Sequence, residues 1–368
     1  MAEGNEGLRV LIAGGGTGGH IIPALAIARE LKDRFHAEVR FVGTSRGLET
    51  RLVPQAGYRL ELIQVGQLKN VSLRTRLRTL LDLPLGLARC FALLREFRPH
   101  AVVGVGGYAS GPAMMAAILS RVPTLAFEPN AAPGLANRLI GKWVNAAAVN
   151  FPPAAAWFRN AEVTGIPVRA EFFSIPRKGA GASPRLLVFG GSQGGRVLNQ
   201  HMAAIAPQLL AALPTLTIMH QAGARHAAQT QADYAASGAP PERWQVQPFL
   251  EDMPDQFALA DLILSRSGAS TVAELAAAGR PALLVPFAAA ADDHQRKNAE
   301  VLADAGAAVL LLEKDVTPEH LLAALLDLLR SPDRLLKMGE RARSLAHPEA
   351  ARRIAEKIDA LAGKRAKS

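Results

Sequence analysis

Two segments of this chain, one near its start and one near its middle, show the same local order of residues. Residues 8–20 read LRVLIAGGGTGGH, and residues 185–196 read RLLVFGGSQGGR. Each is a short apolar run followed by a glycine-rich loop and an amphipathic stretch, which is typical of a strand, a turn and a helix. Strands that are apolar on both faces belong in parallel sheets covered by helices on each side. The repeat therefore predicts two α/β domains.

Short apolar runs alternate with alanine- and leucine-rich stretches along the rest of the chain. We expect strands at residues 8–13, 39–42, 101–105, 123–127, 185–189, 215–219, 262–264, 282–285 and 308–312, and helices at 21–31, 113–119 and 197–210. This alternation predicts two doubly wound, Rossmann-like domains that face each other across a cleft. The boundary between them is expected near residues 165–169, ahead of the second glycine-rich unit.

Length and cysteine content limit the class of protein. A chain of 368 residues, 49% of them hydrophobic, can bury the cores of about two or three domains. Its single cysteine, Cys90, excludes a disulfide framework or an all-cysteine zinc site within one chain and favours a reducing compartment. The first residues lack the basic-then-apolar order of a signal peptide. The uncharged stretch 99–120 contains glycines and prolines that favour a strand, loop and helix over a membrane span.

The chain is basic, and most of the excess lies in its first half. The formal net charge is +10, and residues 1–167 contain 19 basic and 11 acidic side chains, against 23 and 21 in residues 168–368. This bias suits nucleic acid, anionic lipid or a phosphorylated ligand. Only 5% of residues are aromatic, and no RNA-binding or zinc-finger motif is present, which disfavours nucleic acid.

Three glycine-rich loops follow expected strands, at residues 14–19, 106–111 and 190–195. The first contains the G-x-G-x-x-G spacing of dinucleotide-binding domains. A dehydrogenase would also carry an acidic residue at the end of the second strand, and residues 41–44 contain none. Backbone N–H groups of such loops at helix starts can bind an anion. The three loops together favour a phosphorylated ligand.

A few polar residues stand out beside these loops. His20 ends the first loop, where a neutral imidazole can accept a proton from a hydroxyl or simply begin a helix. Thr271 and Glu274 have the spacing of a capping box, but Glu274 could instead accept hydrogen bonds from two sugar hydroxyls, with a helix N-terminus favouring its ionised form. Residues 292–294 form a charged loop rather than a metal site, and Gln295 is a candidate hydroxyl ligand.

Several motifs of other enzyme classes are missing from the sequence. No D-x-D pair is present, which a metal-dependent sugar transferase would usually carry. The phosphate-binding loop of P-loop kinases and the H-E-x-x-H motif of metalloproteases are also absent.

Residues 69–98 are rich in leucine and contain seven basic and two acidic side chains. Their leucines recur at helical spacing, which predicts an amphipathic helix pair broken at Pro84. Two interpretations stay open. The leucines pack into the core, or they contact an anionic membrane surface together with the excess arginines. The neighbouring Lys142 and Trp143 would add an interfacial anchor.

Taken together, these residues closely resemble the MurG family of peptidoglycan glycosyltransferases, over nearly the whole chain. The motifs that carry the resemblance are GGGTGGHIIPALA (14–26), GVGGYASGP (104–112), EPNAAPGLANR (128–138), GIPVR (165–169), FGGSQGGRVLN (189–199), SRSGASTVAELAAAGRPALLVPF (265–287), DDHQRKNA (292–299) and GAA (306–308). The resemblance implies a GT-B fold. Residues 1–167 would form an acceptor- and membrane-associating domain, residues 168–345 a UDP-GlcNAc-binding domain, and a C-terminal helix at about 346–368 would pack back on the first domain.

The resemblance also implies an activity. The family transfers N-acetylglucosamine from UDP-GlcNAc to the 4-hydroxyl of the MurNAc group of lipid I, undecaprenyl-pyrophosphoryl-MurNAc-pentapeptide, with inversion, and so forms lipid II for cell-wall synthesis. It implies neither a metal nor another cofactor, and no nucleic acid. It further implies peripheral attachment to the cytoplasmic face of the plasma (inner) membrane, where other proteins of cell-wall synthesis would be further partners.

Site residues can be carried over by motif. By resemblance, the donor would be bound by Thr17, Gly18, Gly19, Asn130, Arg169, Ser192, Leu250, Ala269, Ser270, Thr271, Val272, Ala273, Glu274 and Gln295. Catalytic candidates would be His20, as the base, and Glu128, with Tyr108 on the acceptor side.

The resemblance assigns each donor group a contact. Arg169 and Ser192 would contact the diphosphate. Leu250 would contact the uracil through its backbone, and Glu274 the ribose. Gln295 and Asn130 would contact hydroxyls of the GlcNAc.

The chain departs from the family pattern at three places, and different activities stay open. Ile166 and Pro129 replace the usual asparagine and glutamine, and residues 288–291 are all alanine. A UDP-GlcNAc 2-epimerase-like enzyme would share this architecture and consume UDP-GlcNAc without an acceptor. A non-catalytic UDP-sugar- or lipid-binding scaffold would use the same loops without turnover, and an NAD-linked dehydrogenase would use the first loop for its cofactor.

Overall fold

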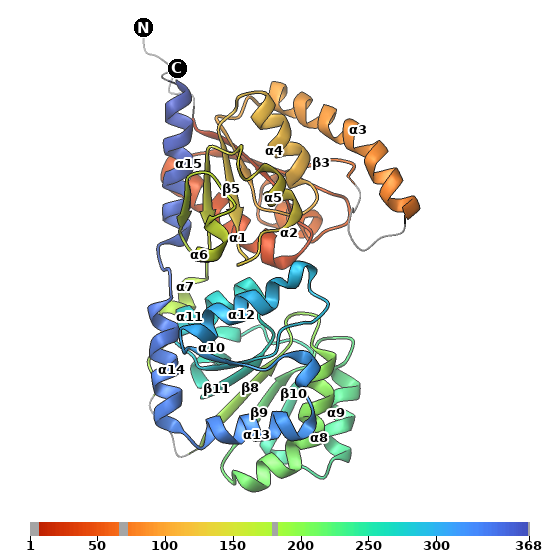
Figure 1. Cartoon of the computed structure of the whole chain (residues 1–368), viewed down its shortest axis with the longest axis vertical. Helices are drawn as coiled ribbons and strands as arrows, with labels where there is room; N and C mark the ends of the chain where they lie inside the picture. Colours follow the sequence, from red (N-terminus) through yellow and green to blue (C-terminus); the bar gives the residue numbers. More distant parts are fainter. Residues whose placement is uncertain (1–6, 66–72, 179–182, 367–368) are drawn as a thin grey trace. The chain divides into compact units, whose positions relative to one another are not determined.

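The computed structural model describes residues 7–65, 73–178 and 183–366. The chain forms two compact units (Figure 1). Unit 1 contains Met1–Pro167 and Glu349–Ser368, and unit 2 contains Val168–Pro348. Unit 1 is therefore built from two segments that are far apart in the sequence.

Unit 1 is built on a parallel sheet. In the described part of the chain this sheet has seven strands in the order β3-β2-β1-β4-β5-β6-β7. The strands are β1 (Arg9–Ala13), β2 (Glu38–Gly43), β3 (Arg59–Leu62), β4 (Ala101–Gly104), β5 (Thr124–Glu128), β6 (Ala146–Val149) and β7 (Ala161–Val163). The strand order reverses between β1 and β4, which lie side by side with Ala13 opposite Gly104. Such a reversal opens a crevice at the carboxyl ends of the two strands.

Helices connect the strands of unit 1. They are α1 (Gly18–Phe35), α2 (Glu49–Gln55), α3 (Leu73–Phe97), α4 (Ser110–Leu119), α5 (Leu135–Ile140), α6 (Pro152–Ala155) and the C-terminal α15 (Ala350–Ala366). Although α15 ends the described chain, it packs against α1, which nearly begins it (Figure 1).

Unit 2 repeats this plan with a six-stranded parallel sheet in the described residues, in the order β10-β9-β8-β11-β12-β13. Its strands are β8 (Arg185–Phe189), β9 (Thr217–Gln221), β10 (Trp244–Gln247), β11 (Leu262–Ser265), β12 (Ala282–Leu284) and β13 (Ala308–Leu310). Its helices are α7 (Ala170–Phe173), α8 (Arg196–Ala212), α9 (Ala227–Ala236), α10 (Met253–Leu259), α11 (Ala269–Ala278), α12 (His294–Asp304), α13 (Pro318–Leu329) and α14 (Pro332–Ser344), with short 3₁₀ turns at Pro241–Arg243, Ala291–Asp293 and Glu313–Asp315.

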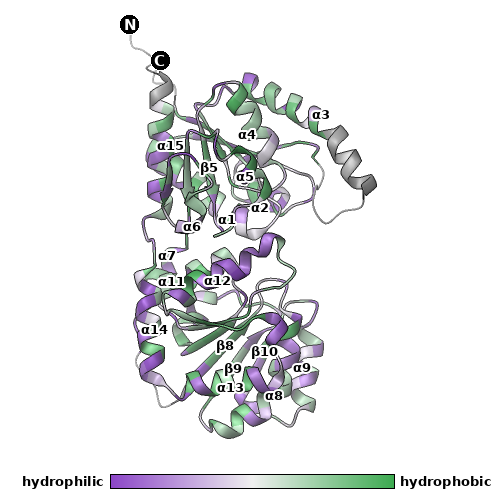
Figure 2. Ribbon diagram, viewed as in Figure 1, coloured by the Kyte–Doolittle hydropathy of each residue, from purple (hydrophilic) through white to green (hydrophobic). Residues whose placement is uncertain are grey.

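The central strands of both sheets are mostly apolar (Figure 2). In β1, β4, β8 and β11 nearly every side chain is buried. This pattern arises because helices cover both faces of each sheet, and it explains why the apolar runs of the sequence predicted these strands correctly. Strands β3, β6, β7 and β10 were not predicted, because they read RLEL, AAAV, AEV and WQVQ and lack a continuous run of large apolar residues.

One expectation about helices was wrong. The leucine-rich segment does not break at Pro84 but forms one helix, α3, with the proline inside it. Leu93 and Leu94 of its second half enter the core, whereas Leu85 is 66% exposed. Residues 69–72, and the side chains of 73–82, lie outside the described part of the chain.

An ion-pair cluster ties α15 to the sheet of unit 1. Arg353 Nη2 and Lys357 Nζ each lie 2.6 Å from a different carboxylate oxygen of Glu162 on β7. Hydrogen bonding from Lys357 is the main reason that the pKa of Glu162 lies below its usual value of 4.5. The ionised carboxylate thus stabilises the folded state.

We predict that Glu162→Gln lowers the free energy of unfolding at neutral pH by up to about 1 kcal/mol, a small effect because the cluster is partly exposed and screened. The lowered pKa means that the difference between wild type and variant is complete above pH 4.5 and disappears as the pH falls further and wild-type Glu162 becomes protonated. Urea unfolding at several pH values measures it. Glu356→Gln, which removes only a pair within α15, is the control; equal effects of both variants would contradict the role of Glu162.

Candidate functional site

The crevice of unit 1 is lined by two glycine-rich loops. Loop 1 (residues 14–19) follows β1, and loop 2 (residues 106–112) follows β4. The Gly15 N–H donates to the carbonyl oxygen of Gly106 at 3.2 Å. A Cβ at Gly14 would lie only 2.2 Å from this same oxygen, so the two backbones approach closer than any side chain would allow.

His20 and loop 2 lie together at this crevice. His20 is half-buried in the first turn of α1, and its Nδ1 lies 3.4 Å from the Thr17 hydroxyl. A Cβ at Gly106 would lie 2.9 Å from His20 Nε2, so the imidazole rests against the bare backbone of loop 2. Tyr108, in the same loop, is 43% exposed. The imidazole of His20 and the exposed Tyr108 thus both belong to segments that line this crevice.

The first three N–H groups of loop 1 already have acceptors within unit 1. The N–H groups of Gly14 and Gly15 donate to backbone carbonyls, and that of Gly16 donates to the buried carboxylate of Glu49 at 2.7 Å. Glu49 was missed because it begins α2 and reaches back to the end of β2, where the sequence shows no acidic residue. Only the N–H groups at the start of α1, near Thr17, still point outward as a helix N-terminus.

Glu128 lies inside unit 1 and not on its surface. The side chain is 1% exposed, and its carboxylate accepts hydrogen bonds from Asn130, Gly134 and Asn137. Burial raises the pKa of Glu128, although these donors oppose the shift. A buried carboxylate with these partners fixes the loop that carries Asn130.

Unit 2 has its own crevice where the strand order reverses, between β8 and β11. Loop 3 (residues 190–195) follows β8, and the Gly194 N–H donates to the Gly191 carbonyl at 3.0 Å. A Cβ at Gly194 would lie 1.9 Å from the Ala222 oxygen. Ser192 is exposed at the tip, and no acceptor for the N–H groups of Ser192 and Gln193 is found within the described residues. The tip of loop 3 can therefore offer N–H groups to an anion.

Gln221 connects loop 3 to the segment that carries Leu250. Its amide donates to the Gly191 carbonyl at 3.1 Å, and its oxygen accepts the Leu250 N–H at 2.8 Å. Gln221 is 1% exposed and was not found from the sequence, because a glutamine at a strand end carries no motif. Since the Leu250 amide is engaged, its carbonyl is the backbone group left to meet a ligand.

Arg169 and Glu274 interact electrostatically in unit 2. Burial raises the pKa of Glu274 to about 7, although the positive charge of Arg169 opposes this shift. At neutral pH this carboxyl is therefore close to the midpoint of its titration. The capping-box interpretation is wrong, because α11 begins at Ala269 with Gly268 as its N-cap. In the described residues no side chain donates a hydrogen bond to Glu274, so its oxygens are available to a ligand.

The first turns of α11 adjoin these two groups. Ser270, Thr271 and Ala273 are half-buried, and Ala269 and Val272 are buried. The N–H groups of Ala269, Ser270 and Thr271 belong to the first turn of the helix, whose N-terminus favours negative charge, whereas the Val272 N–H donates to the Gly268 carbonyl at 3.0 Å.

Gln295 lies at the start of α12 and holds the segment that follows β12. Its side-chain oxygen accepts the Phe287 N–H at 3.0 Å, and its carbonyl accepts the Ser267 hydroxyl at 2.8 Å. Glu313 holds the same segment, because it accepts the Ala288 N–H at 2.7 Å and pairs with the buried Arg266. The amide nitrogen of Gln295 is then the group left for a hydroxyl.

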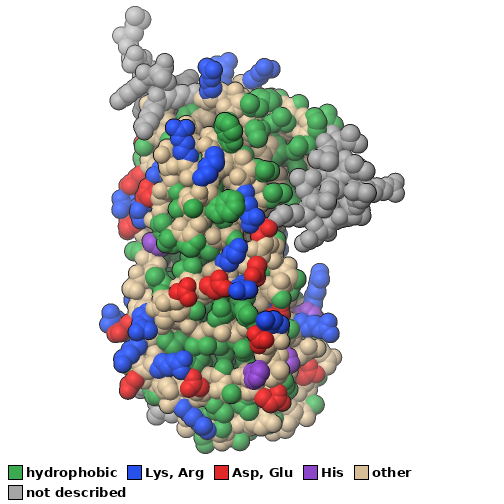
Figure 3. Space-filling view, in the orientation of Figure 1, with side chains coloured by type: hydrophobic (Ala, Val, Ile, Leu, Met, Phe, Trp, Pro, Cys, Tyr) green, Lys and Arg blue, Asp and Glu red, His purple; other side chains and the backbone are tan. Residues whose placement is uncertain are grey.

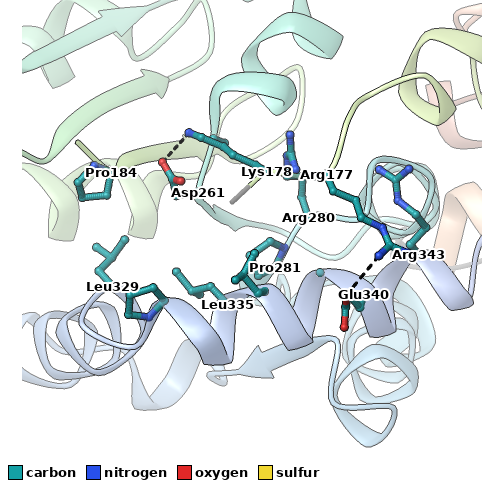
Figure 4. A pocket seen from close by; sticks show the side chains of 15 residues that line it. Arg177, Lys178, Pro184, Asp261, Arg280, Pro281, Leu329, Leu335, Glu340 and Arg343 are labelled. Atoms are coloured by element: carbon teal, nitrogen blue, oxygen red, sulfur yellow. Dashed lines mark hydrogen bonds and ion pairs between the residues drawn. The ribbon is translucent and has the colours of Figure 1, made fainter. Parts of the chain in front are cut away.

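Away from these residues, unit 2 has a cavity of about 210 Å³ (Figure 4). Its cations already have partners: Arg177 pairs with Glu340 at 3.4 Å, and Lys178 with Asp261 at 2.7 Å. None of the predicted site residues lines it. In the described part of the chain no cluster of three or more His, Cys, Asp or Glu side chains is suited to a metal ion. Nor does any described helix have the length and apolarity needed to span a membrane.

Two family models match the chain. Residues 10–149 match the glycosyltransferase family 28 N-terminal domain, and residues 185–356 match the glycosyltransferase family 28 C-terminal domain. The two matches correspond to the two sheets described above.

Curated relatives match over almost the whole chain. A UDP-N-acetylglucosamine--N-acetylmuramyl-(pentapeptide) pyrophosphoryl-undecaprenol N-acetylglucosamine transferase of Solibacter usitatus is 46% identical over 354 residues, covering 96% of each chain. A relative of the same name from Anaeromyxobacter dehalogenans is 45% identical over 95% of this chain and 92% of its own.

Solved structures agree. The crystal structure of MurG from Acinetobacter baumannii is similar with a TM-score of 0.80 and 32% identity, covering 96% of this chain and 99% of that one. A UDP-GlcNAc 2-epimerase from Neisseria meningitidis has a TM-score of 0.65 but only 14% identity, over 95% of this chain and 99% of that one, and so shares the fold alone. Two parallel Rossmann-like sheets with these neighbours define a GT-B fold. The chain therefore belongs to glycosyltransferase family 28 and, within it, to the MurG family.

Proposed function

We propose that this protein transfers N-acetylglucosamine from UDP-GlcNAc to lipid I and so makes lipid II. The observation that carries the proposal is the named activity of relatives that are up to 46% identical over 96% of the chain. An epimerase activity is supported only by a shared fold at 14% identity. A dehydrogenase activity is disfavoured because residues 41–44, at the end of the second strand, contain no acidic residue.

Unit 2 holds the donor in this proposal. The N–H groups of loop 3, together with Ser192 and Arg169, bind the diphosphate, and the helix start at Ala269–Ala278 adds its positive dipole end. The Leu250 carbonyl meets the uracil, and the ionised Glu274 accepts hydrogen bonds from the ribose hydroxyls.

The remaining assignments concern the GlcNAc group of the donor and the acceptor. By resemblance to the family, Gln295 and Asn130 would bind hydroxyls of the GlcNAc, with Thr17, Gly18 and Gly19 as further donor contacts. Tyr108 would meet the acceptor.

Chemistry follows from these assignments. The 4-hydroxyl oxygen of the MurNAc group attacks C1 of GlcNAc, the C1–O bond to the diphosphate breaks, and the configuration at C1 inverts. His20 takes the proton of the attacking hydroxyl. UDP leaves with the electron pair, and Arg169 and the N–H groups of loop 3 stabilise the charge that develops on it. Glu128 acts as a positioning residue, because its carboxylate is buried and bonded to its own loop.

We also propose that unit 1 binds peripherally to the cytoplasmic face of the plasma membrane, where its lipid-linked acceptor is found. Support comes from an apolar face formed by three neighbouring helices. Helix α3 contacts α4, and α4 contacts α5. Exposed residues of this α3–α5 face are Leu83, Leu85, Met115, Leu119 and Leu139. Hydrophobic side chains gather on unit 1, with lysines and arginines near them (Figure 3). Basic and apolar groups together suit an anionic bilayer surface.

We predict that His20→Ala lowers kcat by about 10²- to 10⁴-fold, because the attacking hydroxyl loses its base. UDP binding should stay unchanged, since the proposed donor groups of the diphosphate lie in unit 2. The assay is release of UDP from UDP-GlcNAc with and without a short-chain lipid I analogue, and UDP binding is measured by calorimetry. His36→Asn, at the other end of α1, is the control. Release without acceptor in the wild type would instead favour an epimerase or hydrolase.

We predict that UDP affinity depends on pH through Glu274, whose pKa is about 7. The bound ribose needs the ionised carboxylate, so the dissociation constant should rise as the pH falls below 7, by about tenfold per unit at the steepest. Glu274→Gln should bind more weakly at pH 8 and lack this dependence. Calorimetry across this range tests it, with the exposed Glu251→Gln as control. A Glu274→Gln variant that keeps the wild-type pH profile would refute the assignment.

We predict that Leu85→Glu with Leu119→Glu weakens binding to vesicles of anionic phospholipid by about tenfold or more, because two exposed apolar groups, 66% and 62% exposed, become charged. Vesicle co-sedimentation measures this effect, with UDP binding as a check on folding. The matched control is Leu259→Glu, an exposed leucine of unit 2. An equal loss of vesicle binding in the double variant and in Leu259→Glu would contradict a role of the α3–α5 face in membrane binding.

A further inference from the structure

Unit 1 contains a buried carboxylate that the proposed chemistry does not use. Glu49 is 1% exposed and begins α2. Its Oε2 accepts the Gly16 N–H at 2.7 Å, and its Oε1 accepts both the N–H and the hydroxyl of Thr44 at 3.0 Å. Within the described residues it forms no ion pair with a lysine, arginine or histidine. A buried charge of this kind is stable only if several hydrogen bonds hold it.

The space around Glu49 is shaped for a carboxylate. A Cβ at Gly47 would lie 1.9 Å from Oε2, a Cβ at Gly15 would lie 2.6 Å from the same oxygen, and a Cβ at Gly43 would lie 2.6 Å from Cγ. Three separate glycines therefore leave room for one side chain. Such a cradle of glycines and N–H donors is the usual receptor of a phosphate group in Rossmann-like domains. Here the chain fills it with an anion of its own.

Two contacts link this carboxylate to His20. Gly16 is held from both sides, because its N–H donates to Glu49 and its carbonyl accepts the Leu48 N–H at 3.3 Å. The next residue, Thr17, is the N-cap of α1, and its hydroxyl lies 3.4 Å from His20 Nδ1. The position of the imidazole thus depends on where Glu49 and Leu48 hold Gly16.

We propose that Glu49 is a positioning residue, an internal anion that fixes loop 1 and thereby sets His20 for proton transfer. The same carboxylate occupies the Gly16 N–H, so this group is not available to a ligand. This inference rests on the proposed transferase function.

Chemical rescue tests the proposal. Glu49→Ala removes the carboxylate and leaves a cavity of about the size of a carboxylate group. The hydrogen-bond donors of Gly16 and Thr44 still line this cavity. We expect kcat to fall about 100-fold, because the base is displaced, while KM for UDP-GlcNAc changes by less than about twofold. Added formate or acetate should fill this cavity and restore kcat at least about tenfold, with saturation. Chloride at the same ionic strength should not.

Glu61→Ala is the matched control. Glu61 is another buried glutamate of unit 1, but it pairs with Arg59 and Arg89 and does not contact loop 1. Its variant should show no response to formate, because rescue requires the anion site beside Gly16. Formate rescue of Glu61→Ala to the same degree would overturn the assignment of the effect to Glu49.

Thr44→Val keeps the test decisive if Glu49→Ala does not fold. It removes one hydrogen bond to Glu49 and should lower kcat by about two- to fivefold with thermal stability nearly unchanged. Wild-type kcat in Glu49→Ala, or a folded Glu49→Ala that is inactive and insensitive to formate, would overturn the proposal. So would an unfolded Glu49→Ala together with a fully active Thr44→Val. A wild-type protein without acceptor-dependent turnover would instead refute the proposed function.

Discussion

The structure depends on a close approach of two backbones where the strand order reverses. In unit 1 the loops after β1 and β4 lie so near each other that a single Cβ at Gly14 would collide with the carbonyl of Gly106. Glycine is the residue that satisfies this geometry, because its φ is free and it has no side chain. The imidazole of His20 then rests on bare backbone. The glycines of loops 1 and 2 are thus required for the packing of the two loops, whether or not a ligand binds.

In each unit a polar side chain holds the glycine-rich loop at the point where the strand order reverses. The side chain differs between the two units. In unit 1 a carboxylate, Glu49, fixes the glycine loop and engages one of its N–H groups. In unit 2 a neutral amide, Gln221, fixes the loop through the Gly191 carbonyl and leaves the N–H groups at its tip available. An anion that approaches unit 2 meets donors, whereas loop 1 of unit 1 already holds a negative charge. This difference in charge fits a nucleotide diphosphate on unit 2.

Much of the fold could be predicted from the sequence, because buried parallel strands are continuous apolar runs. Strands such as β1 and β8 were found for this reason, whereas β6, with the sequence AAAV, has no such run. Local spacing also located His20 beside the crevice. It could not reveal Glu49 or Gln221, since each acts on a loop far from it in sequence. Nor could it show that Glu128 is buried or that burial raises the pKa of Glu274, because both depend on tertiary packing.

The division of unit 1 into two chain segments has a consequence for biogenesis. Unit 2 is continuous in sequence, so all of its strands have been synthesised before α15 is complete. Unit 1 receives Arg353 and Lys357, the partners of Glu162, only with the last residues of the chain. Unit 2 can therefore complete its fold during synthesis before unit 1 does. Until α15 has been synthesised, the surface of α1 that α15 covers remains exposed. Unit 1 is thus completed only by a segment that is synthesised after the whole of unit 2.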